Sequence, residues 1–178
     1  MNENALCPGL GDYLIAQARN NHWSNHRLHS ACLRLPASEY YANRPSFFGS
    51  IHIHLDHIVF VDWLYLERLT GEQYLPADVG DELHNELAPL VEDQVTADRA
   101  LIEYCDAATP ETLASEVSFK LLDGTQYTEA VWSVLAHLLT HQIHHRGQVH
   151  DMLSATSVAP PQLDEFSSAP ICRFVRPS

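Results

Sequence analysis

The segment from Phe47 to Leu69 most constrains the fold, because apolar side chains are spread around nearly its whole helical circumference. These residues are Ile51, Ile53, Leu55, Ile58, Val59, Phe60, Val61, Trp63, Leu64 and Leu66. A helix that is apolar on every side is stable only where other elements cover it on every side. Thr70 and Gly71 follow as a plausible C-terminal stop. We therefore expect this segment to be a central helix of a bundle.

Three other segments have helical periodicity. One runs from about Leu10 to Leu33 and is closed by Pro36, and another from about Glu129 to Ala155. The third runs from about Asp81 to Ala107, and Pro89 inside it indicates either a kink or a later start near Pro89 itself. Four helices joined by short connections favour an antiparallel four-helix bundle.

Non-helical signals lie before and after the last helix. Residues 116–121 alternate in polarity, and Asp123-Gly124 then precedes Gln126-Tyr127, which predicts a small β-hairpin. The tail, residues 157–178, carries prolines at positions 160, 161, 170 and 177 and is expected to be extended, with a turn at residues 163–166. The predicted fold is therefore all-α: an antiparallel four-helix bundle, a small β-hairpin before the last helix and an extended C-terminal tail.

Length and composition narrow the class of protein. The chain has 178 residues, which suits a single domain over 1–178, with a core of about 10–156 and a tail of 157–178. The net charge of −13 repels phosphate backbones, so we expect no nucleic-acid partner. No apolar run approaches the ~20 residues of a membrane-spanning helix, and the N-terminus lacks the pattern of a signal peptide. Four scattered cysteines without a CxxC pair fit free thiols. We therefore expect a cytoplasmic protein with no membrane partner.

Histidines are concentrated in the last helix, where five of the 12 in the chain lie between positions 137 and 150. At about 100° per residue, His145 falls within the apolar stripe of this helix and His141 at its edge. His137 and His144 lie on the flank, and His150 faces away. Two inward imidazoles four residues apart can bind one metal ion. The alternative is a pair of core histidines that are hydrogen-bonded to protein groups.

A second cluster, His52, His54 and His57, could supply a third ligand. Three protein ligands with a fourth position open are typical of a catalytic metal site. Because apolar residues surround this helix, periodicity leaves the choice between His54 and His57 open. The i,i+4 pair together with this cluster favours a metal site over core histidines.

Several motifs together resemble the DinB-like (damage-inducible) proteins, in order and with matching spacing from about Leu10 to Phe166. They are Asn21-His-Trp23-Ser-Asn25-His-Arg27-Leu28, Phe47-Phe-Gly-Ser-Ile51, Asp56-His57 with Asp62, His141-Gln-Ile-His-His-Arg-Gly-Gln148, and Ala159-Pro-Pro-Gln-Leu-Asp164. The resemblance implies a four-helix bundle, usually a homodimer, in which three histidines hold a divalent metal ion, zinc or nickel. Carried over by motif, the ligands are His57, His141 and His145. The additional His54 is then a fourth ligand, a base behind the ligands, or local chemistry.

The resemblance also implies a function, because relatives use the metal to activate low-molecular-weight thiols. The leading hypothesis is therefore a metal-dependent thiol S-transferase acting on such a thiol and a small-molecule substrate. The alternatives are a non-catalytic metal-binding stress-response protein and a metal-dependent hydrolase. Peptide hydrolysis is disfavoured because Gln142 stands where an HExxH motif has its glutamate. Catalytic residues are not assigned. Asn25, Trp23 and Tyr65 are candidates for the surroundings of the metal, with core packing favoured for Trp23 and Tyr65. For Arg146 a salt bridge or dimer contact is expected.

Overall fold

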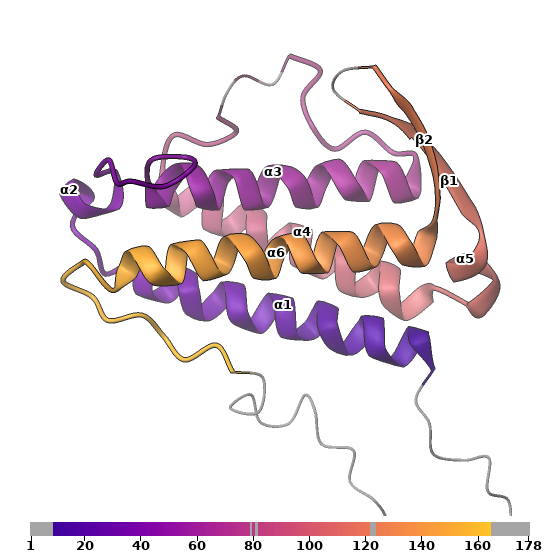
Figure 1. Cartoon of the computed structure of the whole chain (residues 1–178), viewed down its shortest axis with the longest axis horizontal. Coiled ribbons are helices and arrows are strands. Elements are labelled where there is room, and N and C mark those ends of the chain that lie inside the picture. The colour runs from indigo at the N-terminus through magenta and orange to yellow at the C-terminus, as the bar shows by residue number, and fades with distance from the viewer. Residues whose placement is uncertain (1–8, 79, 81, 122–123, 165–178) are drawn as a thin grey trace, which may run out of the picture.

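Four long helices lie side by side in the computed structural model, which describes residues 9–78, 80, 82–121 and 124–164 (Figure 1). The long helices are α1 (Leu10–Cys32), α3 (Ile51–Thr70), α4 (Leu87–Ala107) and α6 (Val131–Leu153). Two short helices, α2 (Ala37–Tyr40) and α5 (Pro110–Ala114), and two strands, β1 (Glu116–Lys120) and β2 (Gln126–Ala130), complete the elements. The predicted all-α bundle with a hairpin before the last helix is confirmed.

Local caps set the ends of the central helix. Helix α3 begins four residues later than expected because Gly49 has a positive φ of 81° and Ser50 caps the helix. The hydroxyl oxygen of Ser50 accepts a hydrogen bond from the backbone N–H of Ile53 at 3.2 Å. At the other end Gly71 takes the left-handed conformation, as predicted, with a φ of 76°.

Two other boundaries also differ from the expectation. Helix α4 begins at Leu87, which places Pro89 in its first turn, so the later of the two predicted starts is correct. Helix α6 begins at Val131 because Glu129 and Ala130 belong to β2, where they pair with β1. The strands form an antiparallel hairpin in which Ser118 faces Thr128.

The direction of each helix follows from contacts between the helices. Asn25 contacts Asp98 and Arg19 contacts Asp106, so α1 and α4 are antiparallel. Helices α3 and α6 are also antiparallel, while α3 and α4 run in the same direction. This arrangement differs from the short connections expected, because α3 ends and α4 begins at opposite ends of the bundle (Figure 1). Asp56 on α3 holds the end of this connection by accepting hydrogen bonds from the backbone N–H groups of residues 83 and 84 at 2.7 and 2.8 Å.

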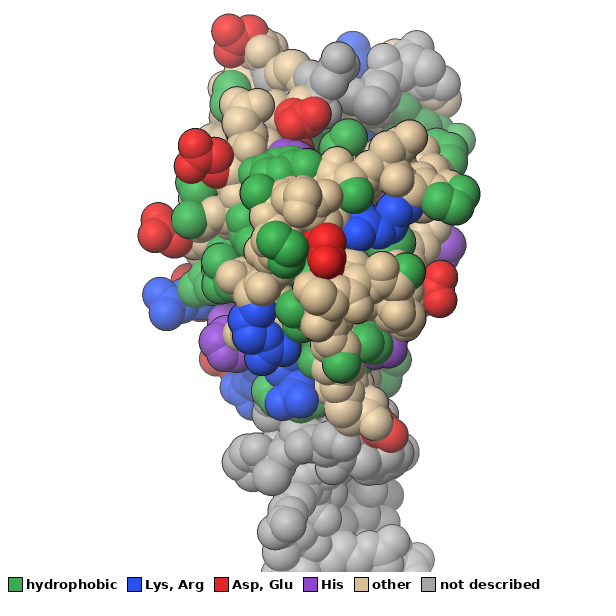
Figure 2. Space-filling view, turned by 90° about the vertical axis from the view of Figure 1, so that its left-hand side faces the viewer, with side chains coloured by type: hydrophobic (Ala, Val, Ile, Leu, Met, Phe, Trp, Pro, Cys, Tyr) green, Lys and Arg blue, Asp and Glu red, His purple; other side chains and the backbone are tan. Residues whose placement is uncertain are grey.

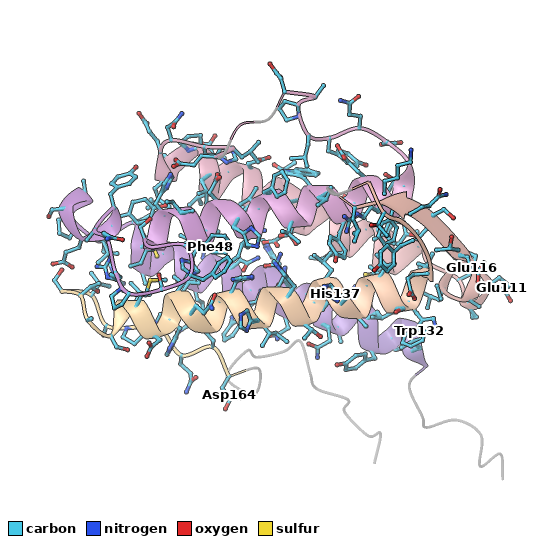
Figure 3. All side chains as sticks on the ribbon, turned by 45° about the horizontal axis from the view of Figure 1, so that its top comes forward. Phe48, Glu111, Glu116, Trp132, His137 and Asp164 are labelled. Atoms are coloured by element: carbon cyan, nitrogen blue, oxygen red, sulfur yellow. The ribbon has the colours of Figure 1, made fainter. Side chains whose placement is uncertain are left out.

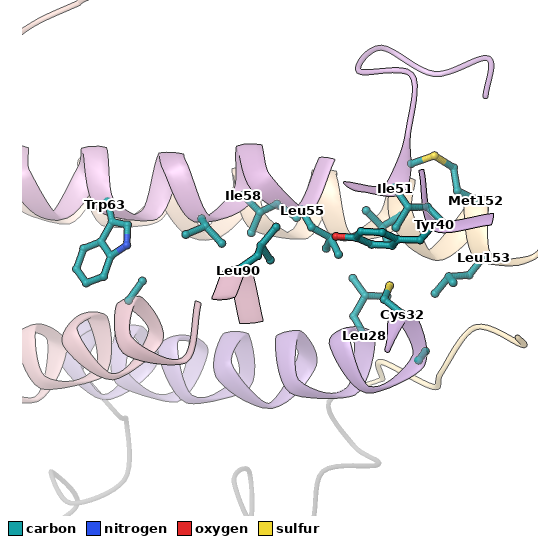
Figure 4. Close-up of a cluster of buried hydrophobic side chains, with 14 of the residues drawn as sticks. Leu28, Cys32, Tyr40, Ile51, Leu55, Ile58, Trp63, Leu90, Met152 and Leu153 are labelled. Atoms are coloured by element: carbon teal, nitrogen blue, oxygen red, sulfur yellow. The ribbon is translucent and has the colours of Figure 1, made fainter. Parts of the chain in front are cut away.

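The core is centred on α3, which confirms its central place in the bundle. Leu55, Ile58 and Leu66 are at most 1% exposed and pack with residues from α1, α4 and α6. Figure 4 shows part of this cluster, with Leu55 and Ile58 labelled. Burying one such side chain stabilises the fold by about 1.5–3 kcal/mol. A second apolar cluster lies toward the hairpin and includes Leu14 and Leu135. Among the described residues, no helix is long and apolar enough to cross a membrane.

The described part of the tail, residues 157–164, is extended as predicted. Arg27 donates from Nε to the carbonyl of Gln162 at 2.8 Å, and His150 donates from Nε2 to the carbonyl of Pro161 at 2.9 Å. His150, expected to face away, is therefore half-buried beneath the tail. The predicted turn at residues 163–166 extends beyond the described residues.

The end of the bundle beside α2 mixes basic, acidic, histidine and hydrophobic side chains among its described residues (Figure 2). Binding of a phosphate backbone requires a continuous basic face instead.

Candidate metal centre

Three histidines converge between α3 and α6. His57 comes from α3, and His141 and His145 come from successive turns of α6. One nitrogen from each ring can be chosen so that the three atoms lie within 4.8 Å of one another. The Nε2 atoms of His57 and His141 are 3.1 Å apart, close to the ligand–ligand separation of about 3.3 Å in a tetrahedral site with Zn–N bonds of 2.0–2.1 Å. These are the three residues proposed from the sequence, and the structure brings them together.

Helix geometry explains the convergence. Residues four apart on α6 project from the same face, so the rings of His141 and His145 lie 4.3 Å apart between centroids. The antiparallel packing of α3 then places His57 opposite this pair, with ring centroids 5.1 Å and 4.7 Å away. The three histidines therefore lie on two helices and not on a loop.

A hydrogen bond orients one of the three rings. Nδ1 of His145 lies 2.8 Å from Oε1 of Gln148, and because an amide oxygen only accepts, Nδ1 carries the proton. The lone pair of His145 is then on Nε2, which is the usual arrangement of a metal-binding histidine. Nδ1 of His141, in contrast, is buried and has no hydrogen-bond partner among the described residues.

Burial keeps the three imidazoles neutral. It lowers the pKa of His57 to about 4, an effect that His145 and His54 add to and Asp56 opposes. Burial and then the neighbouring histidines lower the pKa of His141 to about 3. The pKa of His145 is also lowered, mainly by burial. Because neutral imidazole is the form that binds a metal ion, the site is ready for a cation at neutral pH.

An aromatic ring covers one side of the centre. Phe48, from the segment before α3, lies 4.3 Å from the ring of His57 and 5.6 Å from that of His145, between centroids. Figure 3 shows Phe48 between α3 and α6, with His137 farther along α6 toward the hairpin. A cavity of about 210 Å³ reaches His57 beside Phe48. Phe48 belongs to a sequence motif, but the sequence predicts no role for it, because a residue in an irregular segment has no periodicity to place it.

His54 lies behind the metal centre. It is fully buried, Nδ1 donates to the backbone carbonyl of Ser50 at 2.8 Å, and burial lowers its pKa. Its ring centroid is 6.2 Å from that of His145, and it does not belong to the group of converging nitrogens. His52 is on another side of α3, where Nδ1 contacts the Tyr40 hydroxyl at 3.0 Å. Of the second histidine cluster, only His57 therefore reaches the centre.

The other candidates lie elsewhere. Trp23, expected in the core, is only half-buried and stacks with the guanidinium of Arg27 at 5.1 Å. Tyr65 is half-buried and stacks on His137, with ring centroids 5.7 Å apart. Asn25 is buried but donates to Asp98 at 2.9 Å and is not part of the metal group.

Arg146 differs most from its expected place. It was expected in a salt bridge or a dimer contact, yet it is only 5% exposed, has no carboxylate within ion-pair distance among the described residues, and donates to the amide oxygens of Asn21 and Asn25. The reason is that α6 packs against α1 as well as α3, so its buried surface is wider than its apolar stripe. Asn25 and Arg146 thus belong together, away from the three histidines.

Comparison with known proteins agrees with this architecture. The model of the DinB family matches residues 1–170 of the chain. No curated protein matches it significantly.

Proposed function

The chain belongs to the DinB family, and from the geometry of its three histidines we propose that it binds a divalent metal ion, zinc or nickel, and uses the ion for thiol S-transfer. The observation that carries the proposal is the convergence of neutral nitrogens from His57, His141 and His145 within 4.8 Å. A set of imidazole ligands suits Zn²⁺ and Ni²⁺. The low pKa values of His57 and His141 mean that protons compete little with the cation at neutral pH.

The donor set favours thiol chemistry over hydrolysis. A divalent ion held by neutral ligands keeps its full charge and favours the thiolate over the thiol. No carboxylate belongs to the converging group within the described part of the chain, so the group lacks the side-chain base that HExxH metalloproteases use for hydrolysis. Gln142 does not supply one, because its amide donates to Asp62 in the core. Gln148 holds the tautomer of His145, and Phe48 excludes water from one side of the centre.

The proposed reaction is a nucleophilic substitution at carbon. The thiol sulfur forms a bond to an electrophilic carbon of the acceptor, and the bond from that carbon to its leaving group breaks. The leaving group takes the electron pair of the broken bond, and the thiol proton passes to solvent or to the leaving group. No redox change occurs, so no oxidant or reductant is required.

Metal analysis of purified variants tests the first part of the proposal. We expect about one metal ion per chain in the wild type and almost none in His57→Ala or His141→Ala, because two imidazoles alone hold a metal ion weakly. His144→Ala is the matched control, since His144 is exposed on the same helix. Retention of the full metal content by His57→Ala and His141→Ala would show that the site is wrong.

Conjugation assays test the second part. Metal-loaded protein, metal-free protein and His141→Ala are compared in the reaction of several low-molecular-weight thiols with 1-chloro-2,4-dinitrobenzene. We expect a rate enhancement that requires both the metal and His141. If the protein binds metal but accelerates no thiol above the uncatalysed rate, the transferase is contradicted and the ion has a non-catalytic role.

A further inference from the structure

A cavity of about 360 Å³ lies between α3, α6 and the hairpin. Tyr65 and Arg68 line it from α3, Phe119 and Tyr127 from the hairpin, and His137 from α6. His137 precedes the ligand His141 by one helical turn, which is about 6 Å along the axis. This cavity, named here the Arg68 pocket, therefore ends about one helical turn from the nearest of the three histidines.

Arg68 is held in this pocket without a carboxylate partner. Its guanidinium carbon lies 4.7 Å from the ring centroid of Tyr65 and 4.4 Å from that of Phe119. Nε of Arg68 is buried and has no hydrogen-bond partner, and none of the ion pairs among the described residues includes Arg68. A buried donor on a permanent cation is costly to leave unpaired. The planar fork of a guanidinium matches the two oxygens of a carboxylate.

The position of Arg68 also sets the length of the ligand. The guanidinium of Arg68 lies over Tyr65, which follows His57 by eight residues on α3. The cation is therefore about 12 Å from His57 along the helix axis. The aromatic walls of the pocket suit an apolar connecting chain. A short mercapto acid cannot span this distance.

We propose that the Arg68 pocket binds the carboxylate of an extended thiol whose sulfur lies at the metal centre. The inference rests on the proposed thiol transfer and adds to it the class of thiol: one with a carboxylate roughly 10 Å from the sulfur and an apolar chain between them. Glu129 lines the same pocket and repels such a ligand, so it provides an informative control.

Two probes of equal length test the pocket directly. Calorimetric titration of zinc-loaded protein compares 8-mercaptooctanoate with 8-mercapto-1-octanol, which lacks the carboxylate. We expect the acid to bind about tenfold or more tightly than the alcohol, because a hydrogen bond to a charged group contributes about 1.5–3 kcal/mol. Arg68→Gln should remove this preference, and Arg68→Lys, which keeps the charge but loses the fork, should retain part of it. Glu129→Gln should keep or increase it.

The outcomes separate the pocket from the metal chemistry. If Arg68→Gln and Arg68→Lys both bind the acid with wild-type affinity, the pocket proposal is wrong, whatever the metal does. A third probe, 8-(methylthio)octanoate, is titrated into metal-free protein, where its sulfur cannot coordinate a metal ion. Binding of this probe that weakens about tenfold in Arg68→Gln supports the pocket even if the thiol-transfer assay fails. No binding of this probe to folded wild-type protein contradicts the pocket.

Discussion

Helix α6 contributes to two polar clusters, His141 and His145 to the metal centre and Gln142 and Arg146 to a buried network, and the polar groups of the two clusters are satisfied in opposite ways. We call the second set the Arg146 network: Asn21, Asn25, Asp62, Gln94, Asp98, Gln142 and Arg146, all at most 5% exposed. Within it, side chains from four helices supply donors and acceptors to one another. At the metal centre, in contrast, three ring nitrogens lie within 4.8 Å of one another.

The charges of the Arg146 network nearly cancel. Asp98 accepts hydrogen bonds from Asn21, Asn25 and Gln94 at 2.9–3.1 Å, and Arg146 contributes the balancing cation. Burial, with the charge of Asp98 second, raises the pKa of Asp62 to about 8, so this carboxyl group is mostly protonated at pH 7. Its proton needs an acceptor, and a flipped amide of Gln94 or Gln142 offers the side-chain oxygen that otherwise has no partner.

The contrast separates a structural cluster from a functional one. The Arg146 network needs no outside group, so its role is to fix how the helices pack. The three histidines of the metal centre are neutral, and their converging nitrogens form a group that could hold a cation.

The largest effect is expected from breaking the Arg146 network. Arg146→Met removes the cation and leaves Asp98 charged and buried, which should destabilise the fold by about 3–5 kcal/mol. Urea denaturation of the metal-free protein measures the loss. The double variant with Asp98→Asn should recover much of it, because the uncompensated charge is then gone. Loss of metal from Arg146→Met without loss of stability would show that the two regions are not separate.

An intermediate effect is expected from disturbing the metal centre through Gln148. Gln148→Ala removes the acceptor for Nδ1 of His145, so metal affinity should fall by about 10–100-fold while folding stability of the metal-free protein changes little. Competition with a chromophoric chelator measures the affinity. Gln142→Ala is the matched control on the same helix: it should lower stability through Asp62 and leave metal affinity near the wild-type value. The reverse pattern would contradict the division between the regions.

Sequence periodicity predicted the residues of the metal centre better than it predicted those of the Arg146 network. The phase of α6 singled out His141 and His145 because an inward imidazole stands out against an apolar stripe. His57 could not be chosen over His54 in this way, since α3 is apolar on all sides, and the family resemblance was needed. Arg146 was misplaced because its partners are polar residues of α1, so no hydrophobic pattern marks that face of α6 as buried.

The helices themselves were predictable, and the irregular segments were not. The start of α3 depends on the conformation of Gly49 and the cap of Ser50, which shift a boundary by a few residues without changing the apolar pattern. The direction of α4 depends on the connection that precedes it, and the end of this connection is held by hydrogen bonds from the backbone of residues 83 and 84 to Asp56. Such contacts exist only once the tertiary structure has formed.

The smallest expected effects are changes in folding stability with pH, and different titrating residues cause them below and above neutral pH. Burial lowers the pKa of His29 to about 4 from 6.5, so its contribution to stability is fully present above pH 6.5 and is lost as the pH falls toward 4. His57 and His141 act in the same direction in the metal-free protein. His29→Gln should therefore flatten the acid side of the stability curve by up to about 1.4 kcal/mol per pH unit.

The alkaline side tests the charge balance of the Arg146 network. The folded-state pKa of Asp62 is about 8 against a model value of 3.8, so the folded chain holds a proton that the unfolded chain releases. That contribution is fully present below pH 3.8 and is lost as the pH rises toward 8, at up to about 1.4 kcal/mol per unit. His22, whose pKa is raised by its hydrogen bond to Asp98, adds a fall in the same direction. Denaturation curves from pH 6.5 to 8 should therefore decline less in Asp62→Asn than in the wild type. An equal decline in both proteins would mean that Asp62 is ionised in the folded protein. The Arg146 network would then carry excess negative charge. It would no longer be a self-sufficient cluster that contrasts with the metal centre.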